Sequence, residues 1–349
     1  MPVVLPAAKV LVSGASGYIA AWLVRTLLQQ GYSVRGTARS KEKGAFLLDL
    51  FKSYGDKFEF VVVEDMTKEG AFDEAVKGID AIQHTASPFH FNADDPKELI
   101  DPAVNGTIGI LKSALKNAPD VKRITVLASC ACVLRVENSP HVFSENDWND
   151  QSIVEVESLG RKASPMAKYR ASKTLAEKAA WAFHRDHEKE VNWDLVVINP
   201  PFVFGPVIHP VATLKDLNTS AKEWYDVVVA PGSSGRTNEQ LATLGSCWVD
   251  VRDLASALSL TLVVAEAGNE RIIVSAGAFH WQDWLDAANS LSPSPFSRPL
   301  PVGAPGAGKN VPHKIDYDTS KERKILKVKY KTIEESTKDT LADFESRGW

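Results

Sequence analysis

The sequence is poor in cysteine and has no excess of positive charge. Three cysteines among 349 residues, Cys130, Cys132 and Cys247, do not provide a disulfide framework. No histidine cluster accompanies the Cys130–Cys132 pair, and a structural zinc site needs four ligands, so no metal site is expected. A formal net charge of -4 argues against nucleic acid and anionic membranes as partners, because both require a surplus of cations.

Long hydrophobic runs are also missing. The longest apolar segment, LASALSLTLVVAEA, follows the charged DVRD and is too short to span a bilayer. No basic region precedes an apolar one at the start of the chain, so no signal peptide is expected. These absences favour a cytoplasmic protein in a reducing compartment. We expect a monomer, with a dimer as the alternative, because no long amphipathic helix requires a partner.

Short runs rich in Val, Ile and Leu alternate with helical patterns in the first part of the chain. Six runs have the composition of buried strands: AKVLVSG, YSVRGTA, FEFVVVED, IDAIQHTA, VKRITVLAS and WDLVVINPP. Helices are expected at IAAWLVRTLLQQG and near 42–53, 69–77, 96–117 and 166–189. This alternation predicts an α/β fold of the Rossmann type, a doubly wound parallel sheet with helices on both faces.

The rhythm breaks after NPPFVFGP. Proline and glycine become frequent, and an irregular stretch is expected from about 205 to 245. Long loops within a compact chain more often have a function than not, so this stretch is expected to serve the site. We therefore predict a dinucleotide-binding domain at 1–200 and a smaller mixed lobe, mainly for substrate binding, at 201–349. The boundary is approximate. A return of the chain to the large sheet near 247–275 is compatible with this prediction.

A glycine-rich turn lies between the first predicted strand and the first predicted helix. SGASGYIAAW places Gly14, Gly17 and Ala20 at the spacing G-x-x-G-x-x-A. The first glycine permits a tight turn, the second lets a pyrophosphate approach the backbone, and the small alanine lets helix and sheet pack closely. The helix N-terminus then faces the pyrophosphate. The expected cofactor contacts are Gly14, Ser16, Gly17, Tyr18 and Ile19.

The second predicted strand lacks the acid that a dinucleotide-binding chain usually has there. No Asp or Glu occurs between Gly31 and Lys41, whereas Arg35 and Arg39 flank the strand end and Lys43 follows. An acid would hydrogen-bond the ribose 2′-hydroxyl of NAD, while arginine binds the 2′-phosphate of NADP through its bidentate fork. An ordinary solvated surface explains the lysine well but not the missing acid. The sequence therefore favours NADP.

The third predicted strand is followed by VEDMT, which supplies Asp65 and Met66. Asp65 is placed to hydrogen-bond the adenine amine, and Met66 is placed to cover the ring. A simple loop aspartate is the alternative explanation.

Tyr169 and Lys173 lie four residues apart in KYRASKTLAEKAAW, so a helix would place both on one face. A free tyrosine has a pKa near 10, and we expect the neighbouring ammonium to lower it. Tyr169 would then donate a proton to a substrate oxygen while Lys173 holds the nicotinamide ribose. Ser129 ends the fifth predicted strand, at the ligand side of the sheet, where it can bind the same oxygen. A slip of one residue would put Cys130 there instead.

Several segments resemble the extended short-chain dehydrogenases/reductases. They are most similar to the branch that holds dihydroflavonol 4-reductase, cinnamoyl-CoA reductase and the fungal NADPH-dependent carbonyl and methylglyoxal reductases. The similar pieces span almost the whole chain: SGASGYIA, VRGTARS, VVEDM, HTASP, PAVNGT, YRASK, NPPFVFGP, WVDVRDLA, AGAFHWQDWL and TIEESTKDT. VRGTARS and the C-terminal pieces are closer to the fungal reductases than to the plant enzymes.

The resemblance implies a catalytic set of Ser129, Tyr169 and Lys173. It also implies that Asn105 bends a helix and holds a water in a proton relay. Further residues are expected along the cofactor channel and at the nicotinamide: Thr85, Ala86, Ser87, Pro88, Pro200 and Val203.

The function expected from these features is reduction of an aldehyde or ketone to an alcohol by NADPH. The alternatives are a dihydroflavonol- or cinnamoyl-type reductase acting on an aromatic substrate, a sugar-nucleotide epimerase or dehydratase, and an NADP-sensing protein without turnover. Arg35 and Arg39 argue against the epimerases, and Tyr169 with Lys173 against the sensor. The substrate is expected to be an apolar or aromatic carbonyl compound that contacts Phe89, Ser129, Tyr169, Phe202 and Trp224.

Overall fold

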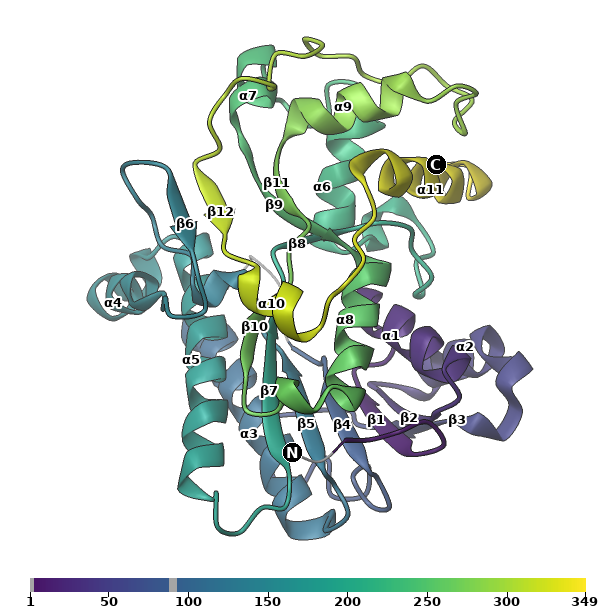
Figure 1. The fold of residues 1–349 in the computed structure, drawn as a ribbon, viewed down its shortest axis with the longest axis vertical. Coiled ribbons are helices and arrows are strands. Elements are labelled where there is room, and N and C mark those ends of the chain that lie inside the picture. The colour runs from purple at the N-terminus through teal and green to yellow at the C-terminus, as the bar shows by residue number, and fades with distance from the viewer. Residues whose placement is uncertain (1–2, 88–92) are drawn as a thin grey trace.

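A parallel sheet of seven strands forms the centre of the computed structural model, which describes residues 3–87 and 93–349 (Figure 1). Its strand order is β10-β7-β5-β4-β1-β2-β3, and every neighbouring pair is parallel. The strands are β1 (Lys9–Ser13), β2 (Ser33–Ala38), β3 (Phe58–Val62), β4 (Ala81–His84), β5 (Arg123–Leu127), β7 (Asp194–Asn199) and β10 (Arg271–Ile273). The predicted Rossmann-type architecture is confirmed.

Side-chain alternation along the strands gives the sheet two buried faces. Val10 and Val12 of β1 belong to one hydrophobic cluster, whereas Leu11 between them belongs to another. The first cluster includes α1 (Tyr18–Gln29) and α8 (Val251–Val263), which pack together; the second includes α3 (Lys97–Asn117) and α5 (Pro165–Asp186), which do the same. These helices cover opposite faces of the sheet (Figure 1). α2 (Lys41–Leu50) lies beside β2 and β3.

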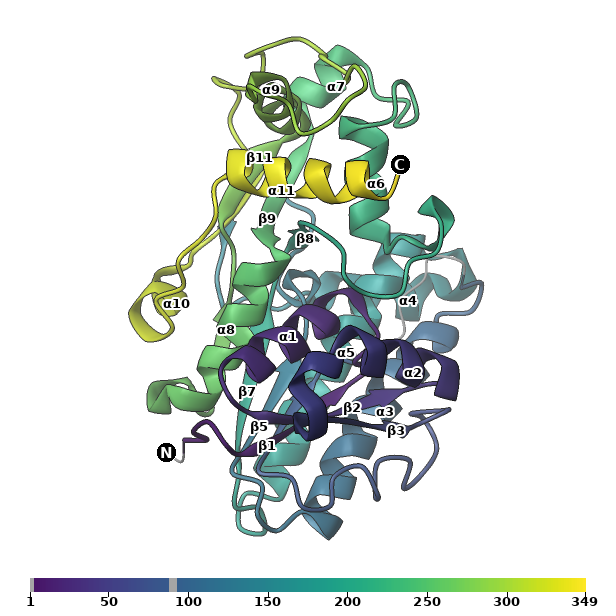
Figure 2. The ribbon, with the colours of Figure 1, turned by 90° about the vertical axis from the view of Figure 1, so that its right-hand side faces the viewer.

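The second lobe is built on a mixed sheet of order β11-β9-β8, formed by β8 (Phe202–Phe204), β9 (Gly245–Asp250) and β11 (Gly277–His280). The rings of Phe204, Trp224, Phe279, Trp284 and Phe344 form its core. Its helices are α6 (Thr219–Val228), α7 (Asn238–Thr243), α9 (Trp281–Ser290) and α11 (Ile333–Ser346). Figure 2 shows α11 lying across this lobe, above the helices that cover the large sheet.

Smaller elements join the two parts. β6 (His141–Phe143) pairs in parallel with β12 (Ile315–Tyr317), so a late segment of the chain lies beside the region that follows β5. The remaining helices are α4 (Asp150–Leu159), α10 (Ser320–Ile325) and the short 3-10 turns η1 (Lys52–Lys57), η2 (Cys130–Cys132), η3 (Gly160–Lys162), η4 (Leu214–Asp216) and η5 (Ala265–Ala267).

Two local predictions were wrong. The stretch 69–77 forms successive turns instead of a helix, and Gly70 and Gly78 at its borders both have positive φ. Glycine adopts such angles without strain, so turns are favoured there. The stretch 205–245 is not one irregular loop, because it contains η4, α6 and α7.

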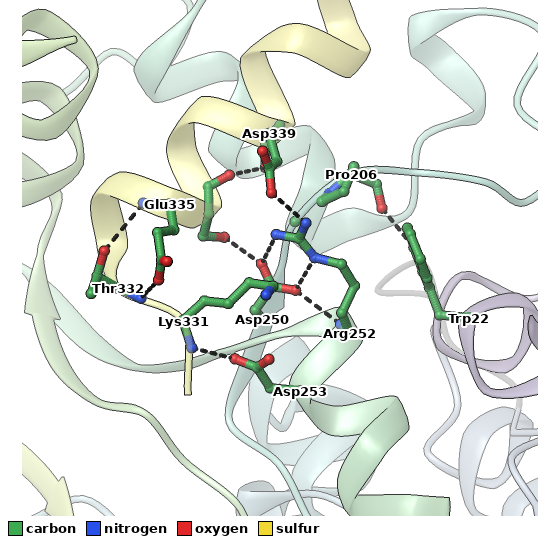
Figure 3. A network of polar contacts seen from close by, with 12 residues as sticks. Trp22, Pro206, Asp250, Arg252, Asp253, Lys331, Thr332, Glu335 and Asp339 are labelled. Atoms are coloured by element: carbon green, nitrogen blue, oxygen red, sulfur yellow. Dashed lines mark hydrogen bonds and ion pairs between the residues drawn. The ribbon is translucent and has the colours of Figure 1, made fainter. Parts of the chain in front are cut away.

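A buried carboxylate ties the C-terminal helix to the rest of the molecule (Figure 3). Asp250 is fully buried, and its carboxylate accepts hydrogen bonds from the backbone N–H and the guanidinium of Arg252 and from the Ser336 hydroxyl of α11. Arg252 also pairs with Asp339 of α11. On the opposite side, the indole of Trp22 in α1 donates to the carbonyl of Pro206 at 2.8 Å. These contacts connect the large sheet, the second lobe and the end of the chain.

Candidate active site

A cavity of about 220 Å³ lies at the carboxyl ends of β1, β2 and β4. Gly14 begins the turn after β1 with φ +65°, and an added Cβ would lie 3.0 Å from the Cα of Ala86. Helix α1 has Gly17 as its N-cap, without a capping side chain and without an acid in its first turn. Its free N–H groups and positive dipole end therefore suit a pyrophosphate. The cavity is lined by Gly14, Ser16, Gly17, Thr37, Ala38, Arg39, Lys43, Val63, Met66, Phe72, Thr85, Ala86 and Ser87.

Ser13, the residue before Gly14, connects the end of β1 to the segment after β4 through its side chain. Its hydroxyl oxygen accepts hydrogen bonds from the backbone N–H groups of Thr85 and Ala86, both at 3.0 Å. The same oxygen lies 2.9 Å from Nδ1 of His84, so the hydroxyl proton can be donated to the ring. Burial lowers the pKa of His84 to about 3, and the charge of Lys173 acts in the same direction. His84 is thus a neutral, hydrogen-bonded structural residue.

The cations predicted to lie near the end of β2 have two different environments. Arg39 and Lys43 line the cavity, and neither side chain has a hydrogen bond or ion pair with any residue that the structure describes. Arg35 lies within the strand instead of at its end, opposite Glu59 of β3. Its guanidinium pairs with the Glu59 carboxylate at 2.6 Å and donates to the carbonyls of Ala75 and Lys77. The prediction that Arg35 binds the cofactor is therefore corrected, because its guanidinium already binds the Glu59 carboxylate and two backbone carbonyls.

Other predicted cofactor contacts lie beside the cavity without lining it. The hydroxyl of Tyr18 donates to the carbonyl of Gly205 at 2.7 Å, and Ile19 packs against the main core, so only their backbone N–H groups can serve a pyrophosphate. Asp65 accepts from the backbone N–H and the hydroxyl of Thr67 at 2.9 and 2.6 Å. These bonds lower the pKa of Asp65, and the charge of Arg39 contributes less. Met66, next to Asp65, does line the cavity.

Ser129 and Tyr169 come together at the end of β5. The side chain of Ser129 lies near the hydroxyl of Tyr169, and the Ser129 hydroxyl oxygen accepts a hydrogen bond from the backbone N–H of Ala131 at 3.1 Å. Cys130 does not take this place, because its thiol is buried and donates to the carbonyl of Asn199. Burial raises the pKa of Tyr169 to about 12, against the lowering effect of Ser129. The expected lowering by the neighbouring lysine is therefore wrong for this structure.

Lys173 connects the catalytic helix to the cavity. Its ammonium donates to the hydroxyl of Ser87, a cavity residue, at 2.9 Å, and burial lowers its pKa. Lys173, on the same helix as Tyr169, thus reaches the nucleotide cavity. Such an arrangement can bind a carbonyl oxygen, give it a proton and hold a ribose beside it.

Two positioning residues were missed by sequence reasoning, because only tertiary contacts reveal them. The side-chain amide of Asn199 donates to the carbonyl of Ser129 at 3.0 Å and to Glu177 at 2.8 Å. Glu177 in turn pairs with Arg271 of β10, so the end of β5 is fixed by a buried network. Lys168, also buried, donates to the carbonyls of Ala93, Asp94 and Arg161, and anchors the segment after 88–92 to α5.

Some predicted site residues lie elsewhere. Asn105 is exposed on α3, where it borders a shallow groove with Lys178 and Ala179 of α5, and this face of α5 points away from Tyr169. Its predicted relay role is corrected, because the helix rotation turns it outward.

The aromatic residues predicted to contact the substrate lie in different environments. Trp224 is 1% exposed and packs its ring against Trp284 and Phe344, so it belongs to the lobe core and cannot contact a substrate directly. Phe202 stacks on Phe204 and remains partly exposed. Phe89 and Pro88 lie outside the described residues.

Pro200 and Val203 follow β7. The carbonyl of Pro200 accepts from the backbone N–H of Cys130 at 2.9 Å, which places it next to Ser129. Val203 is buried in β8, with its carbonyl bonded to Ser220. Neither residue lines the nucleotide cavity.

Comparisons with known proteins agree with this geometry. The model of the NAD dependent epimerase/dehydratase family matches residues 10–277. A ketoreductase of Aspergillus niger is 37% identical over 341 residues, covering 96% of this chain and 97% of its own. The NADPH-dependent methylglyoxal reductase of Saccharomyces cerevisiae is 36% identical over 355 residues, covering 97% and 99%.

Solved structures give the same result. The yeast methylglyoxal/isovaleraldehyde reductase in complex with NADPH superposes with a TM-score of 0.83 at 34% identity, covering 97% of this chain and 99% of its own. Within the described ranges, no helix is both long and apolar enough to cross a membrane. The resemblance to extended short-chain dehydrogenases/reductases is confirmed, and the chain belongs to the NAD dependent epimerase/dehydratase family.

Proposed function

We propose that this protein is an NADPH-dependent carbonyl reductase that converts an aldehyde or ketone to an alcohol. The observation that carries the proposal is that Ser129 lies near Tyr169, while Lys173 of the same helix as Tyr169 bonds to Ser87 in a cavity that has the glycine-rich turn of a dinucleotide site. The relatives named as a ketoreductase and a methylglyoxal reductase support the same chemistry.

Each residue of the cluster has a distinct task in this reaction. NADPH, when bound, supplies the hydride. Ser129 donates a hydrogen bond to the substrate carbonyl oxygen and so orients the carbon. Tyr169 is protonated at neutral pH because burial raises its pKa to about 12, and it transfers its proton to the oxygen as negative charge develops. Lys173 holds the cofactor ribose. Residues 201–349 mainly shape the substrate side.

Arg39 and Lys43 are proposed to bind the 2′-phosphate that distinguishes NADPH from NADH. We expect Arg39→Gln to raise the KM for NADPH by ~10–100-fold, because a charge-assisted hydrogen bond contributes about 1.5–3 kcal/mol. Reaction with NADH, which lacks this phosphate, should change little. The measurement is kcat/KM with both nucleotides.

Arg35→Gln is the matched control for this prediction. It removes the same charge four residues earlier, but Arg35 lies within β2 and pairs with Glu59 outside the cavity. We expect an unchanged NADPH/NADH ratio for Arg35→Gln. If the NADPH/NADH ratio of kcat/KM fell in Arg35→Gln and stayed unchanged in Arg39→Gln, the roles of the two arginines would be reversed.

The proposed function is tested by following the hydride itself. The protein is incubated with NADPH carrying deuterium at the transferred position and with methylglyoxal, isovaleraldehyde, an aromatic β-keto ester or a dihydroflavonol. We expect an alcohol that contains one deuterium, identified by mass spectrometry, from at least one substrate. Measurable NADPH binding without any labelled alcohol from this panel would contradict the proposal and favour a sensor without turnover.

A further inference from the structure

Tyr18 is the first residue of α1, and its backbone and side chain face different parts of the molecule. It follows Gly17, the cavity residue that caps the helix, so its backbone N–H is one of the free donors at the helix N-terminus. Its side chain is 6% exposed, and its hydroxyl donates to the carbonyl of Gly205 at 2.7 Å. One residue therefore connects the glycine-rich turn to the segment that follows β8 in the second lobe.

The hydroxyl of Tyr18 is kept as a hydrogen-bond donor by its surroundings. Burial raises the pKa of this phenol well above its usual value, and the charge of Asp250 raises it further. The ring of His209 lies against the tyrosine ring, with the two centroids 5.3 Å apart. A buried phenol that stays protonated at neutral pH can donate continuously to the carbonyl of Gly205.

The residues that receive this bond have a fixed backbone. Gly205 has φ +121°, and a Cβ added to it would lie 3.1 Å from Oδ2 of Asp250, so the chain requires glycine there. The carbonyl of Pro206 accepts from the indole of Trp22, one turn after Tyr18 on α1, at 2.8 Å (Figure 3). Two side chains on one face of α1 thus hold two consecutive carbonyls of the second lobe.

Helix α11 holds the next residue of this segment. The backbone N–H of Val207 donates to the carboxylate of Asp343 at 3.1 Å, and the carbonyl of Val207 accepts from the guanidinium of Arg347 at 2.5 Å. Residues 205–207 form neither a helix nor a strand, so their backbone groups depend on such side-chain partners. The position of the segment is therefore set by α1 and α11 together.

The other end of the same segment lies at the catalytic serine. The side-chain amide of Asn199, the last residue of β7, donates to the carbonyl of Ser129 at 3.0 Å. The chain then passes through Pro200 and Pro201 into β8 and reaches Gly205. Each proline ring fixes its own φ, so this connection is stiff. A displacement at Gly205 would therefore be carried along β8 toward Ser129.

We propose that Tyr18 is a positioning residue that couples nucleotide binding at the glycine-rich turn to the placement of residues 199–205 beside Ser129. NADPH bound to the N–H groups of the turn restricts the first turn of α1, so the bond from Tyr18 to Gly205 then forms at a smaller loss of conformational entropy. Because coupling between two sites is reciprocal, a carbonyl compound beside β8 also tightens the binding of NADPH. The inference rests on the proposed function for its consequence on the substrate.

The test follows amide hydrogen exchange by mass spectrometry, with and without saturating NADPH and with no carbonyl substrate. In the wild type we expect NADPH to slow exchange in peptides that cover residues 200–209 by ~2–10-fold, the range for one hydrogen bond. In Tyr18→Phe, which retains the backbone donor, this dependence on NADPH should disappear. A bond that only stabilises the fold would change exchange equally with and without NADPH, so the ratio of the two rates isolates the coupling.

Tyr32→Phe is the matched control for the exchange experiment. It removes a buried hydroxyl that also donates to a backbone carbonyl, that of Val4, at 2.8 Å. Its exchange ratio at 200–209 should equal that of the wild type. A Tyr18→Phe variant that keeps the wild-type ratio would overturn the inference. So would a wild type in which NADPH leaves the exchange of 200–209 unchanged, a result that needs no variant.

Steady-state kinetics measure the consequence for the substrate. In Tyr18→Phe we expect the KM for isovaleraldehyde or methylglyoxal to rise ~2–10-fold, with a smaller change in kcat, because the substrate side of β8 is less ordered. A KM equal to that of the wild type would overturn the link to the substrate. If the wild type reduces no carbonyl compound, the proposed function fails, whereas NADPH-dependent exchange that requires Tyr18 would still support the coupling.

Discussion

Tyr169→Phe is expected to lower kcat by ~10²–10⁴-fold, the usual contribution of a positioned general acid. The substitution removes only the hydroxyl, which lies near Ser129, and leaves the ring in its half-buried position. NADPH should still bind, because the cavity lining does not include Tyr169. The measurement is kcat at saturating carbonyl substrate, together with NADPH affinity from fluorescence titration.

Tyr32→Phe is the matched control for this experiment. Tyr32 is buried, and its hydroxyl donates to the carbonyl of Val4 at the amino end of β2, whereas the cavity lies at the carboxyl end of this strand. We expect its kcat to stay near that of the wild type. A Tyr169→Phe enzyme that retains more than about a tenth of kcat would mean that another group supplies the proton.

Asp250→Ala is expected to lower the free energy of unfolding by about 3–5 kcal/mol, the range for breaking a buried ion pair from one side. The reason is that the Arg252 guanidinium, the Ser336 hydroxyl and the first-turn N–H of α8 all lose the same buried acceptor. Figure 3 shows Arg252 and Asp250 at the centre of this network. The measurement is the urea unfolding midpoint and slope of each variant.

Asp339→Ala removes the other carboxylate that pairs with Arg252. Its side chain is 45% exposed, whereas that of Asp250 is fully buried. Exposed pairs contribute about 0–1 kcal/mol, so this control should unfold almost like the wild type. Equal losses in both variants would contradict the view that burial makes Asp250 the anchor of the C-terminal helix.

Much of the fold was predictable because its local patterns agree with its tertiary contacts. The continuous apolar runs around Val10 and Val196 become central strands buried on both faces. The failure at 69–77 has a local cause: an apolar pattern was present, but the bordering glycines at positive φ favour turns. The helices within 205–245 depend on the aromatic core of the second lobe, which a short sequence window does not reveal.

The candidate site also contains residues that the sequence pattern predicts and residues that only tertiary contacts reveal. Gly14, Gly17 and Arg39, which were predicted to bind the cofactor, line one cavity because strand-turn-helix order brings them to the same edge of the sheet. Arg35 was misplaced because composition alone does not say whether a residue lies within a strand or at its end. Asn199 was missed because its amide acts through a network that spans distant segments.

The central claim is that carbonyl reduction at Tyr169 draws its hydride from NADPH. The most direct measurement is the initial rate of nucleotide oxidation by the wild type with its best carbonyl substrate, first with NADPH and then with NADH. We expect NADPH to be consumed in equal amount to the alcohol formed, with kcat/KM at least ~10-fold above that for NADH, since one charge-assisted phosphate contact contributes about that much. A preference for NADH, or nucleotide binding without consumption, would contradict the account.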